Sequence, residues 1–366
     1  MFGSFGYGNA GDEAAWMAVN DLAERAGISG GVDVVTRFDE PWSDSVLGLG
    51  EKYSDQRKAL SGQPLLIVGG GVIENSDYCV LLRAQKLLKE LIVPRVALLG
   101  VNADSGVRYG WRLKRSLRRA LAKADFVSVR DYLSQTSCEF LCPKRSVEVT
   151  GDIVLCMKPG ETVPAEVEDL EGFIAVTLAP RWSSEPEWRE WITNELAQTA
   201  RQLQMPLVFV PCCTRFDDDR TEHAAVVAAL RSVAPEVRTL ELTSHMDARQ
   251  VSAVLARANL AVGMRLHACV MAVANGVPCV GLAYHPKLHG LARTLGCQEH
   301  FLPRTVPAGR RNVEFAGYSF AESGIHEEKL AEIAESAIQN LSLSLEHVDR
   351  LRSKIEAAFR CAVGLG

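Results

Sequence analysis

Short apolar runs alternate with longer helical patterns through almost the whole chain, and this alternation constrains the fold more than any other feature. The strand-like runs are residues 32–35, 65–68, 95–99, 126–129 and 147–149 in the first half, and 173–178, 207–210, 239–242, 260–263 and 279–283 in the second. Helical periodicity separates many of them, as in residues 187–204, 220–233 and 246–257. Strands that alternate with helices form parallel sheets covered on both faces. The sequence therefore predicts an α/β fold.

Two domains are expected because 366 residues exceed what one ordinary core encloses. Segment 158–172, KPGETVPAEVEDLEG, is polar and acidic, carries two prolines and is the best linker between them. We predict two Rossmann-like, doubly wound domains, residues 1–158 and 172–325, that face each other across a cleft. A very short strand at the N-terminus is a further candidate. Residues 326–366 carry two helical patterns and no strand pattern, and this C-terminal helical segment is a candidate for packing back on the N-terminal domain.

Composition argues against several classes of protein. The formal charge of −5 lacks the basic excess of a nucleic-acid-binding protein, so no nucleic acid partner is expected. The ten cysteines show no zinc-ligand spacing, so no metal site is predicted, and we interpret them as small buried side chains in a reducing cytoplasm. The opening residues lack the basic and apolar regions of a signal peptide, which also favours a cytoplasmic location. The sequence has no GxxxxGK[ST] loop, which argues against a P-loop nucleotide hydrolase.

Unusual residues follow the predicted strands of the first half, where an open α/β sheet binds its ligand. Gly70 and Gly71 of LIVGGGVIEN follow residues 65–68, Arg130 of SVRDYLS follows residues 126–129, and Asp152 of VTGDIV follows residues 147–149. For Arg130, an ion pair with the adjacent Asp131 at the surface is an equal alternative.

A glycine-rich loop, GSFGYGNAGDEA, precedes the first helical pattern. Glycines let a backbone approach a ligand closely, and the amides of a helix N-terminus favour an anion. Asn9 and Asp12 in this loop are candidates for ligand contact, and capping of the helix is an equal alternative for both.

The second half repeats the arrangement after two strands. Arg265 and His267 of GMRLHA follow residues 260–263, and His285 and Lys287 of YHPK follow residues 279–283. Arginine, lysine and histidine side chains that meet at one sheet edge favour a ligand that bears phosphate or carboxylate. If the strand geometry persists, Arg265 and His267 share a face, whereas a helix that begins between them would make two separate contacts.

A basic stretch, YGWRLKRSLRRALAKAD, occupies residues 109–125. The simplest interpretation is the solvated face of a helix. Attraction to anionic lipid, and hence peripheral membrane contact, or to a pyrophosphate-linked acceptor is the alternative.

The ordered set GYGNAGDEA, GGG, SVRD, GD, MRLHA and YHPK resembles the polysaccharide pyruvyl transferase family over roughly residues 3–295. The resemblance implies a GT-B-like fold, that of the two-Rossmann-domain glycosyltransferases, with donor binding in residues 172–325. It implies phosphoenolpyruvate as the donor substrate, with no cofactor, and a glycan or lipid-linked saccharide as the acceptor. The product would be a pyruvate ketal of a cell-envelope polysaccharide, made in the cytoplasm or at the inner face of the membrane.

Carried over by motif, the resemblance implies that Arg130, Arg265, His267 and Lys287 form the donor site. Phosphoenolpyruvate is strongly anionic, so we expect Arg130 and Arg265 to bind its charged groups and Lys287 to assist phosphate departure. The vinyl carbon needs a general acid, which we assign to His267.

Further candidates complete the predicted site. Gly70 and Gly71 are expected beside the donor, and Asn9, Asp12, Asp152 and His285 are candidates for acceptor or loop contacts. Asp12 and Asp152 are also candidates for the base that activates the sugar hydroxyls. The family more usually has Tyr-Asp-Pro-Lys where this chain has YHPK, a departure that bears on acceptor choice or local charge.

Two other functions fit the same architecture. A GT-B nucleotide-sugar glycosyltransferase would bind a nucleoside diphosphate and ignore phosphoenolpyruvate. A family relative without catalytic activity would only bind glycan. Retention of the motif residues favours an enzyme, and an oligomer is compatible with all three functions.

Overall fold

The structure is a computed structural model, and it describes residues 1, 3, 5, 8–29, 32, 34–36, 46–48, 62–73, 79–82, 84, 92–104, 110–180, 186–215, 217–283, 285–303, 314–315, 318–319 and 329–365. Residues 33 and 109 and the predicted domain boundary at 325–326 lie outside the described residues.

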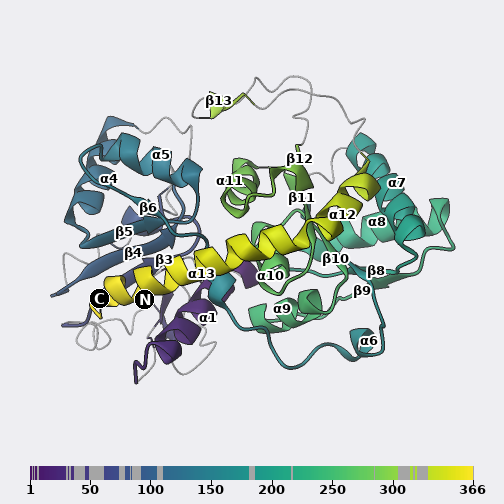
Figure 1. Ribbon diagram of the computed structural model, residues 1–366, viewed down its shortest axis with the longest axis horizontal. Coiled ribbons are helices and arrows are strands. Elements are labelled where there is room, and N and C mark those ends of the chain that lie inside the picture. Colours follow the sequence, from purple (N-terminus) through teal and green to yellow (C-terminus); the bar gives the residue numbers. More distant parts are fainter. Residues whose placement is uncertain are drawn as a thin grey trace.

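The N-terminal domain is built on parallel strands (Figure 1). Its four-stranded sheet has the order β3 (Leu65–Val68), β4 (Val96–Val101), β5 (Phe126–Val129) and β6 (Glu148–Val149). A parallel pair, β1 (Val34–Thr36) and β2 (Val46–Gly48), precedes it in the chain. The predicted α/β class is confirmed for this half of the chain.

The C-terminal domain contains a six-stranded parallel sheet with the order β12-β11-β10-β7-β8-β9. The strands are β7 (Ile174–Thr177), β8 (Leu207–Phe209), β9 (Thr239–Glu241), β10 (Leu260–Gly263), β11 (Cys279–Ala283) and β12 (Phe301–Pro303). In order of appearance they lie as 3-2-1-4-5-6, which is the Rossmann order. The direction of winding reverses between β7 and β10, so the ligand position of this domain is expected at their carboxyl ends.

Alternate residues of each central strand enter different cores, because successive side chains point to opposite faces. In β3, Leu66 and Val68 enter a core that spans both domains, whereas Leu65 and Ile67 enter a core of the N-terminal domain. In β7, Ala175 enters the shared core, and its two neighbours enter a third core. Burial on both faces explains why these strands are continuously apolar in sequence.

Helices cover both faces of each sheet. In the N-terminal domain they are α1 (Ala10–Arg25), α4 (Trp111–Lys123), α5 (Tyr132–Leu141) and the 3₁₀ helix η1 (Ile153–Cys156). In the C-terminal domain they are α7 (Pro186–Leu203), α8 (Asp219–Val233), α9 (Ala248–Ala256), α10 (Leu266–Ala274), α11 (Pro286–Leu295) and the short η3 (Gln298–His300). None of the helices in the described ranges is both long and apolar enough to cross a membrane.

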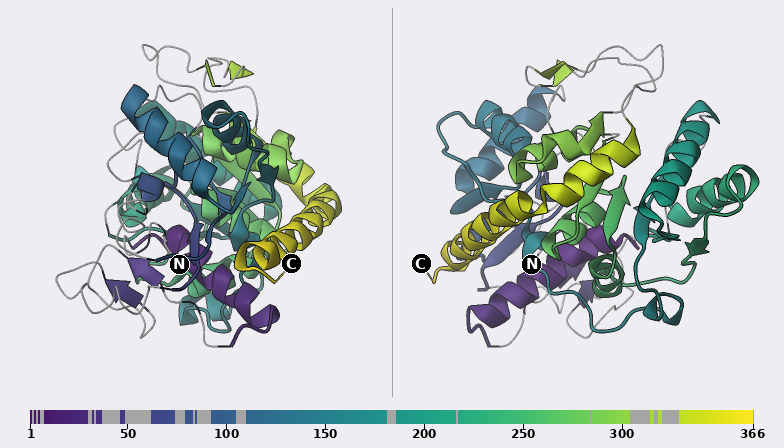
Figure 2. Two further views of the ribbon diagram at one scale, coloured as in Figure 1. Left: turned by 90° about the vertical axis from the view of Figure 1, so that its left-hand side faces the viewer. Right: turned by 45° about the vertical axis from the view of Figure 1, so that its right-hand side comes forward.

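The C-terminal segment forms α12 (Leu330–Gln339) and the long α13 (Leu341–Val363), which runs from the C-terminal domain across to the N-terminal sheet (Figures 1 and 2). Helix α13 packs against β4 and η1. Arg352 on α13 donates to the carbonyls of Leu155 in η1 and Ala274 in α10. The C-terminal segment therefore packs against both domains.

Some details differ from the sequence prediction. No strand precedes α1 among the described residues, and Asn9 instead forms an isolated bridge with Cys213. The linker contains a short helix, α6 (Ala165–Glu168). The prediction omitted β2, β12 and the hairpin of β13 (Glu314–Phe315) with β14 (Tyr318–Ser319), because strands this short carry too few residues for a periodic pattern.

Candidate active site

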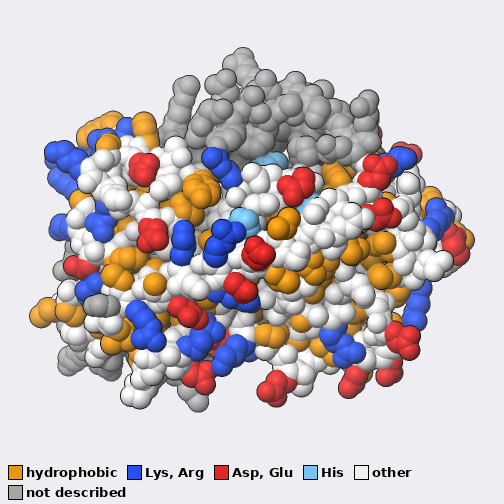
Figure 3. All heavy atoms as spheres, viewed as in Figure 1, with side chains coloured by type: hydrophobic (Ala, Val, Ile, Leu, Met, Phe, Trp, Pro, Cys, Tyr) orange, Lys and Arg blue, Asp and Glu red, His pale blue; other side chains and the backbone are white. Residues whose placement is uncertain are grey.

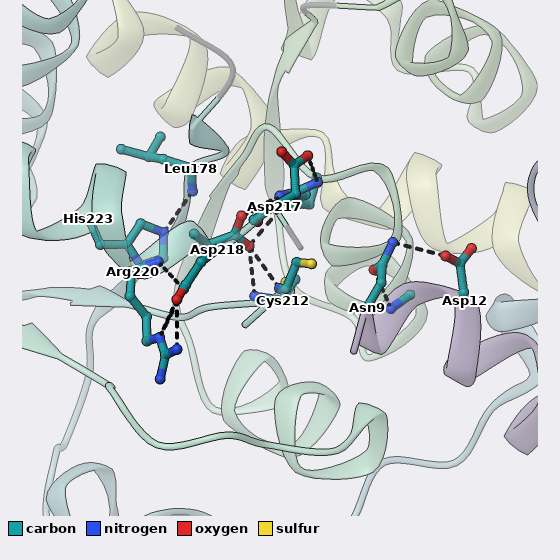
Figure 4. Close-up of polar contacts among 12 residues, drawn as sticks. Asn9, Asp12, Leu178, Cys212, Asp217, Asp218, Arg220 and His223 are labelled. Carbon is teal, nitrogen blue, oxygen red and sulfur yellow. Dashed lines mark hydrogen bonds and ion pairs between the residues drawn. The ribbon is translucent and has the colours of Figure 1, made fainter. Parts of the chain in front are cut away.

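The start of α1 lies against the C-terminal domain. Asn9 is the N-cap of α1, and its Oδ1 accepts a hydrogen bond from the backbone N–H of Gly11 at 3.0 Å. Its Nδ2 donates to Oδ2 of Asp12 at 3.0 Å, as Figure 4 shows. The N–H of Ala10 donates to the carbonyl of Cys212, in the loop after β8, at 2.8 Å. This loop-to-loop contact fixes the first turn of α1 at the domain boundary.

Arg130 and Asp152 lie together at the carboxyl edge of the N-terminal sheet. Arg130 follows β5 and is 7% exposed, with its Nε donating to Asp131 at 3.0 Å. Its Nη1 lies 3.7 Å from Oδ2 of Asp152, which is also buried. Asp152 is the N-cap of η1, where Oδ1 accepts from the N–H of Val154. The pairing with Asp131 thus exists, but in the interior and not at the surface.

His267 enters the same cluster from the other domain. Its Nε2 lies 3.5 Å from Oδ2 of Asp152, so one carboxylate faces both His267 and Arg130. The imidazole also packs directly on α1, because a Cβ built on Gly11 would lie 2.2 Å from its Nδ1. Gly11 is therefore the residue that allows α1 and α10 to approach each other at the site.

Arg265 points elsewhere, because α10 begins between it and His267. Arg265 is the extended N-cap residue, and the helix starts at Leu266. Its guanidinium donates through Nε to Asp219 at 3.0 Å and through Nη2 to the carbonyl of Asp217 at 2.8 Å. Figure 4 places Asp217 beside Asp218 at the start of α8. The two motif residues thus make separate contacts.

Asp219 is a fully buried anchor that sequence reasoning missed. Besides Arg265, its carboxylate accepts the backbone N–H groups of Cys212 and Cys213, each at 3.0 Å. Through Cys212 it also supports the contact with Ala10 at the start of α1. The acidic run FDDDR before a helical pattern is a signal for a capping or ligand role, but nothing in the spacing identifies Arg265 as the partner.

The remaining predicted residues lie outside the direct contacts of Asp152 with His267 and Arg130. Gly70 comes close to α1, since a Cβ there would lie 3.3 Å from Oδ1 of Asp12. Gly71 has a positive φ of 63° and accepts from the N–H of Val80, a contact within its own domain. His285 is exposed and caps α11, with Nδ1 accepting from the N–H of Lys287 at 3.2 Å. Lys287 itself is partly buried.

The two central carboxyl groups have opposite pKa shifts. Burial raises the pKa of Asp12, although the positive charges of His267, Lys287, Arg130 and Arg265 act against this rise. Basic side chains of both domains therefore act on one carboxyl group.

At Asp152, burial alone would raise the pKa, but the charge and hydrogen bond of His267, together with Arg130, hold the pKa below its ordinary value. Asp152 is therefore the more acidic member of the pair, and Asp12 is the more basic carboxyl group.

Glu13 is a second residue that sequence reasoning missed. It follows Asp12 on α1, is 3% exposed, and its Oε1 has no hydrogen-bond partner among the described residues. Burial, followed by the charges of Asp12 and Asp247, raises the pKa of Glu13 to about 8. The sequence shows only a carboxylate in a first helical turn, where an exposed position is the ordinary expectation.

The site thus brings Asn9, Asp12, Gly70, Arg130, Asp152, His267 and Lys287 toward one region between the domains. Within this region, Nε2 of His267 lies 3.5 Å from Oδ2 of Asp152, and Nη1 of Arg130 lies 3.7 Å from the same oxygen. The arrangement combines an imidazole able to donate a proton, a partly buried carboxyl group able to accept one, and several cations suited to an anionic substrate.

Comparison with protein families gives one match. The model of the family described as polysaccharide pyruvyl transferase matches residues 9–286, a range that contains the site residues named above except Lys287, which follows it directly. None of the curated proteins compared with the chain matches it significantly.

Solved structures share the fold at low sequence identity. The S. aureus MnaA co-structure with UDP has a TM-score of 0.59 and 10% identity, with 100% of this chain and 96% of that chain covered. Trehalose-6-phosphate synthase OtsA has a TM-score of 0.54 and 10% identity over 95% and 93% of the two chains. UDP-GlcNAc 2-epimerase of Methanocaldococcus jannaschii, in complex with UDP-GlcNAc and UDP, has a TM-score of 0.52 and 13% identity over 90% and 91%. The predicted GT-B-like fold, with parallel sheets in two domains and C-terminal helices, is confirmed.

Proposed function

The chain belongs to the polysaccharide pyruvyl transferase family, and from this premise we propose that it moves the enolpyruvyl group of phosphoenolpyruvate onto two hydroxyls of one glycan sugar. Phosphate is released and a pyruvate ketal is formed. The observation that carries the proposal is the contact of His267 with Asp152 beside Arg130, at the boundary of the two domains.

The charges near Asp12 suit this donor. Phosphoenolpyruvate carries a carboxylate and a phosphate ester on the same carbon atom, so it needs at least two cationic partners. Arg130 from the N-terminal domain and Lys287 from the C-terminal domain are the proposed partners, since both act electrostatically on Asp12. Arg265 is proposed to contribute its charge at longer range and to hold the loop after β8, because its guanidinium is engaged by Asp219.

The proposed reaction begins with proton transfer from His267 to the methylene carbon of the donor, which becomes a methyl group. The adjacent carbon becomes cationic and forms a bond with one sugar hydroxyl oxygen, which loses its proton. Phosphate then leaves with the C–O bonding electrons, and the second hydroxyl closes the ring with loss of its proton. In the overall proposed reaction, phosphoenolpyruvate and the diol give the ketal and phosphate. The steps balance in atoms and charge and need no electron transfer and no cofactor.

Asp152 and Asp12 take different parts in this scheme. Asp152 orients His267 through the contact of its Oδ2 with Nε2 of the imidazole at 3.5 Å. Asp12 is the proposed base for a sugar hydroxyl, because a raised pKa makes its carboxylate a stronger base than an ordinary aspartate. Asn9 holds Asp12 in place through its amide, and Gly70 leaves space beside it.

The test is to incubate the protein with phosphoenolpyruvate labelled with carbon-13 at C2 and a panel of glycans and lipid-linked saccharides. Release of phosphate together with a new ketal carbon signal in the NMR spectrum is the expected result. In heavy water the product methyl group should carry deuterium, because the proton of the acid exchanges with solvent. His267→Asn should abolish turnover, and His347→Asn on α13 should retain it. Absence of phosphate release with every acceptor would refute the proposal.

A nucleotide-sugar glycosyltransferase is the second candidate, because the MnaA and M. jannaschii epimerase structures that share the fold contain UDP. Thermal shift measurements with phosphoenolpyruvate and with UDP-N-acetylglucosamine separate the two. Stabilisation by the nucleotide sugar alone would favour the second candidate.

A further inference from the structure

Helix α4 presents an unusually basic surface on the outside of the N-terminal domain. Its sequence, WRLKRSLRRALAK, contains six basic residues and no acidic one: Arg112, Lys114, Arg115, Arg118, Arg119 and Lys123. Leu117 and Leu121 are buried in the core beneath the helix. The whole chain has a formal charge of −5, so this concentration of positive charge is a local feature. In Figure 3 basic side chains gather at the edge of the molecule over α4.

Some of these basic residues serve the fold, and others face solvent. Nε of Arg118 donates to the carbonyl of Leu141, at the end of α5, at 2.6 Å. Arg112, Arg115 and Arg119 are exposed and follow the i, i+3, i+7 spacing of one helix face. These three residues therefore form an outward basic stripe.

Large aromatic side chains accompany this surface. Trp111 at the start of α4 is 69% exposed, and Phe140 near the end of α5 is 60% exposed. The guanidinium of Arg112 lies 5.2 Å from the centre of the Trp111 ring, and Nζ of Lys114 lies 4.0 Å from the centre of the Phe140 ring. Exposed tryptophan and phenylalanine beside lysine and arginine are the combination that interfacial helices use at membranes.

The position of α5 connects this surface to the candidate site. Helix α5 follows Arg130 directly, with Asp131 as its N-cap, and it ends beside Arg118. Ten residues of α-helix span about 15 Å. The aromatic and basic surface thus lies about one short helix away from Arg130.

We propose that the outward face of α4, together with Phe140, docks the protein on an anionic lipid surface and holds the site within reach of a lipid-linked acceptor. The choice of acceptor rests on the proposed function, whereas docking itself does not. Arg112, Arg115 and Arg119 attract the lipid headgroups, while Trp111 and Phe140 enter the interface. The single acidic residue of α5, Glu139, adjoins Phe140 and leaves the excess positive.

Lipid fits this surface better than nucleic acid or an acidic glycan. Electrostatic attraction alone explains affinity for any polyanion, but it does not explain two large aromatic side chains kept in water. At an interface they bury their rings, and this gain adds to the attraction of the basic stripe.

The experiment measures co-flotation of the full chain with phosphatidylcholine vesicles, with and without phosphatidylglycerol, in the absence of phosphoenolpyruvate. Binding only to the anionic vesicles, weakened by salt, is the expected result. The triple variant Arg112→Gln, Arg115→Gln and Arg119→Gln should lower the partition coefficient on the order of one hundredfold, since each basic residue near such a surface contributes about 1 kcal/mol, or roughly fivefold.

A matched control carries the same change of charge elsewhere: Lys329→Gln, Lys354→Gln and Arg360→Gln, all at exposed positions near or on α12 and α13. This control should bind vesicles as the unchanged protein does. Trp111→Ser should weaken vesicle binding and leave binding to dextran sulfate unchanged, which separates interfacial insertion from simple charge attraction.

Three results would overturn the inference: no binding to anionic vesicles, equal losses in the α4 variant and the control, or binding to dextran sulfate without binding to vesicles. A protein that binds anionic vesicles but releases no phosphate would support docking and contradict the proposed function alone.

Discussion

Replacing Gly11 by alanine tests the contact on which the proposed chemistry depends. The added Cβ would lie 2.2 Å from Nδ1 and 2.7 Å from Cβ of His267. Nonbonded carbon atoms pack best at about 3.5–4.0 Å, so the gap is about 1 Å too small. Because the second contact is with the Cβ of His267, rotation of the imidazole does not relieve it. Helix α1 or α10 must move instead.

The expected consequence is a loss of rate greater than the loss of stability. A displacement of about 1 Å at a catalytic group can lower a rate on the order of one hundredfold. Alanine is favoured over glycine inside a helix by about 1 kcal/mol, which offsets part of the steric cost. We therefore expect Gly11→Ala to lower kcat on the order of one hundredfold, with a melting temperature close to that of the unchanged protein.

The assay is phosphate release from phosphoenolpyruvate with the acceptor identified by the NMR panel, combined with thermal unfolding. Gly110→Ala is the matched control, because a Cβ at this position meets no atom within 4 Å and the backbone has a negative φ. Full turnover by Gly11→Ala would refute the reasoning, and so would an equal loss in the control.

Three further predictions concern buried carboxyl groups. Asp219→Asn removes one partner of a buried ion pair with Arg265, and we expect a loss of about 3–5 kcal/mol in the free energy of unfolding measured in urea; an unchanged unfolding midpoint would contradict this. The pKa of Glu13 is about 8 in the folded state, against an ordinary value of 4.5. Between these pH values the folded state binds more protons than the unfolded state. The contribution of Glu13 to the free energy of unfolding therefore decreases by roughly 1.4 kcal/mol per pH unit as pH rises. Glu13→Gln should therefore raise the melting temperature at pH 8.5 and change it little at pH 5, and equal changes at both would show that Glu13 is not buried as described. Asp152→Asn should lower kcat, because the carboxylate that lies 3.5 Å from Nε2 of His267 and orients the imidazole is lost; an unchanged kcat would exclude the proposed role.

Local sequence predicted several elements closely. The bounds of β3, β5, β10 and β11 agree with the predicted runs, because each is a short apolar segment that ends at a glycine or polar residue. The two helices of the tail also agree in type. The short strands β2, β12, β13 and β14 could not be predicted, because two or three residues that are held by neighbouring strands show no alternating pattern in the sequence.

The candidate site was less predictable than the fold. The motifs identified Arg130, Asp152 and His267, and parallel topology explains why residues after different strands meet at one edge. The motif MRLHA did not reveal that Arg265 and His267 diverge. That outcome depends on helix α10 beginning at Leu266, and on a buried Asp219 that lies 46 residues away from Arg265 in sequence.

The sequence by itself determined the α/β class, the two parallel sheets and the set of polar residues at their carboxyl edges, because apolar periodicity and strand ends are local properties. Only the tertiary structure decided which of those residues meet. The packing of α1 on α10 at Gly11, the bond of Arg352 on α13 to η1, and the contact of Asp152 with His267 all join residues far apart in the chain. Such contacts arise from the shapes of surfaces far apart in the chain, and no local pattern encodes them.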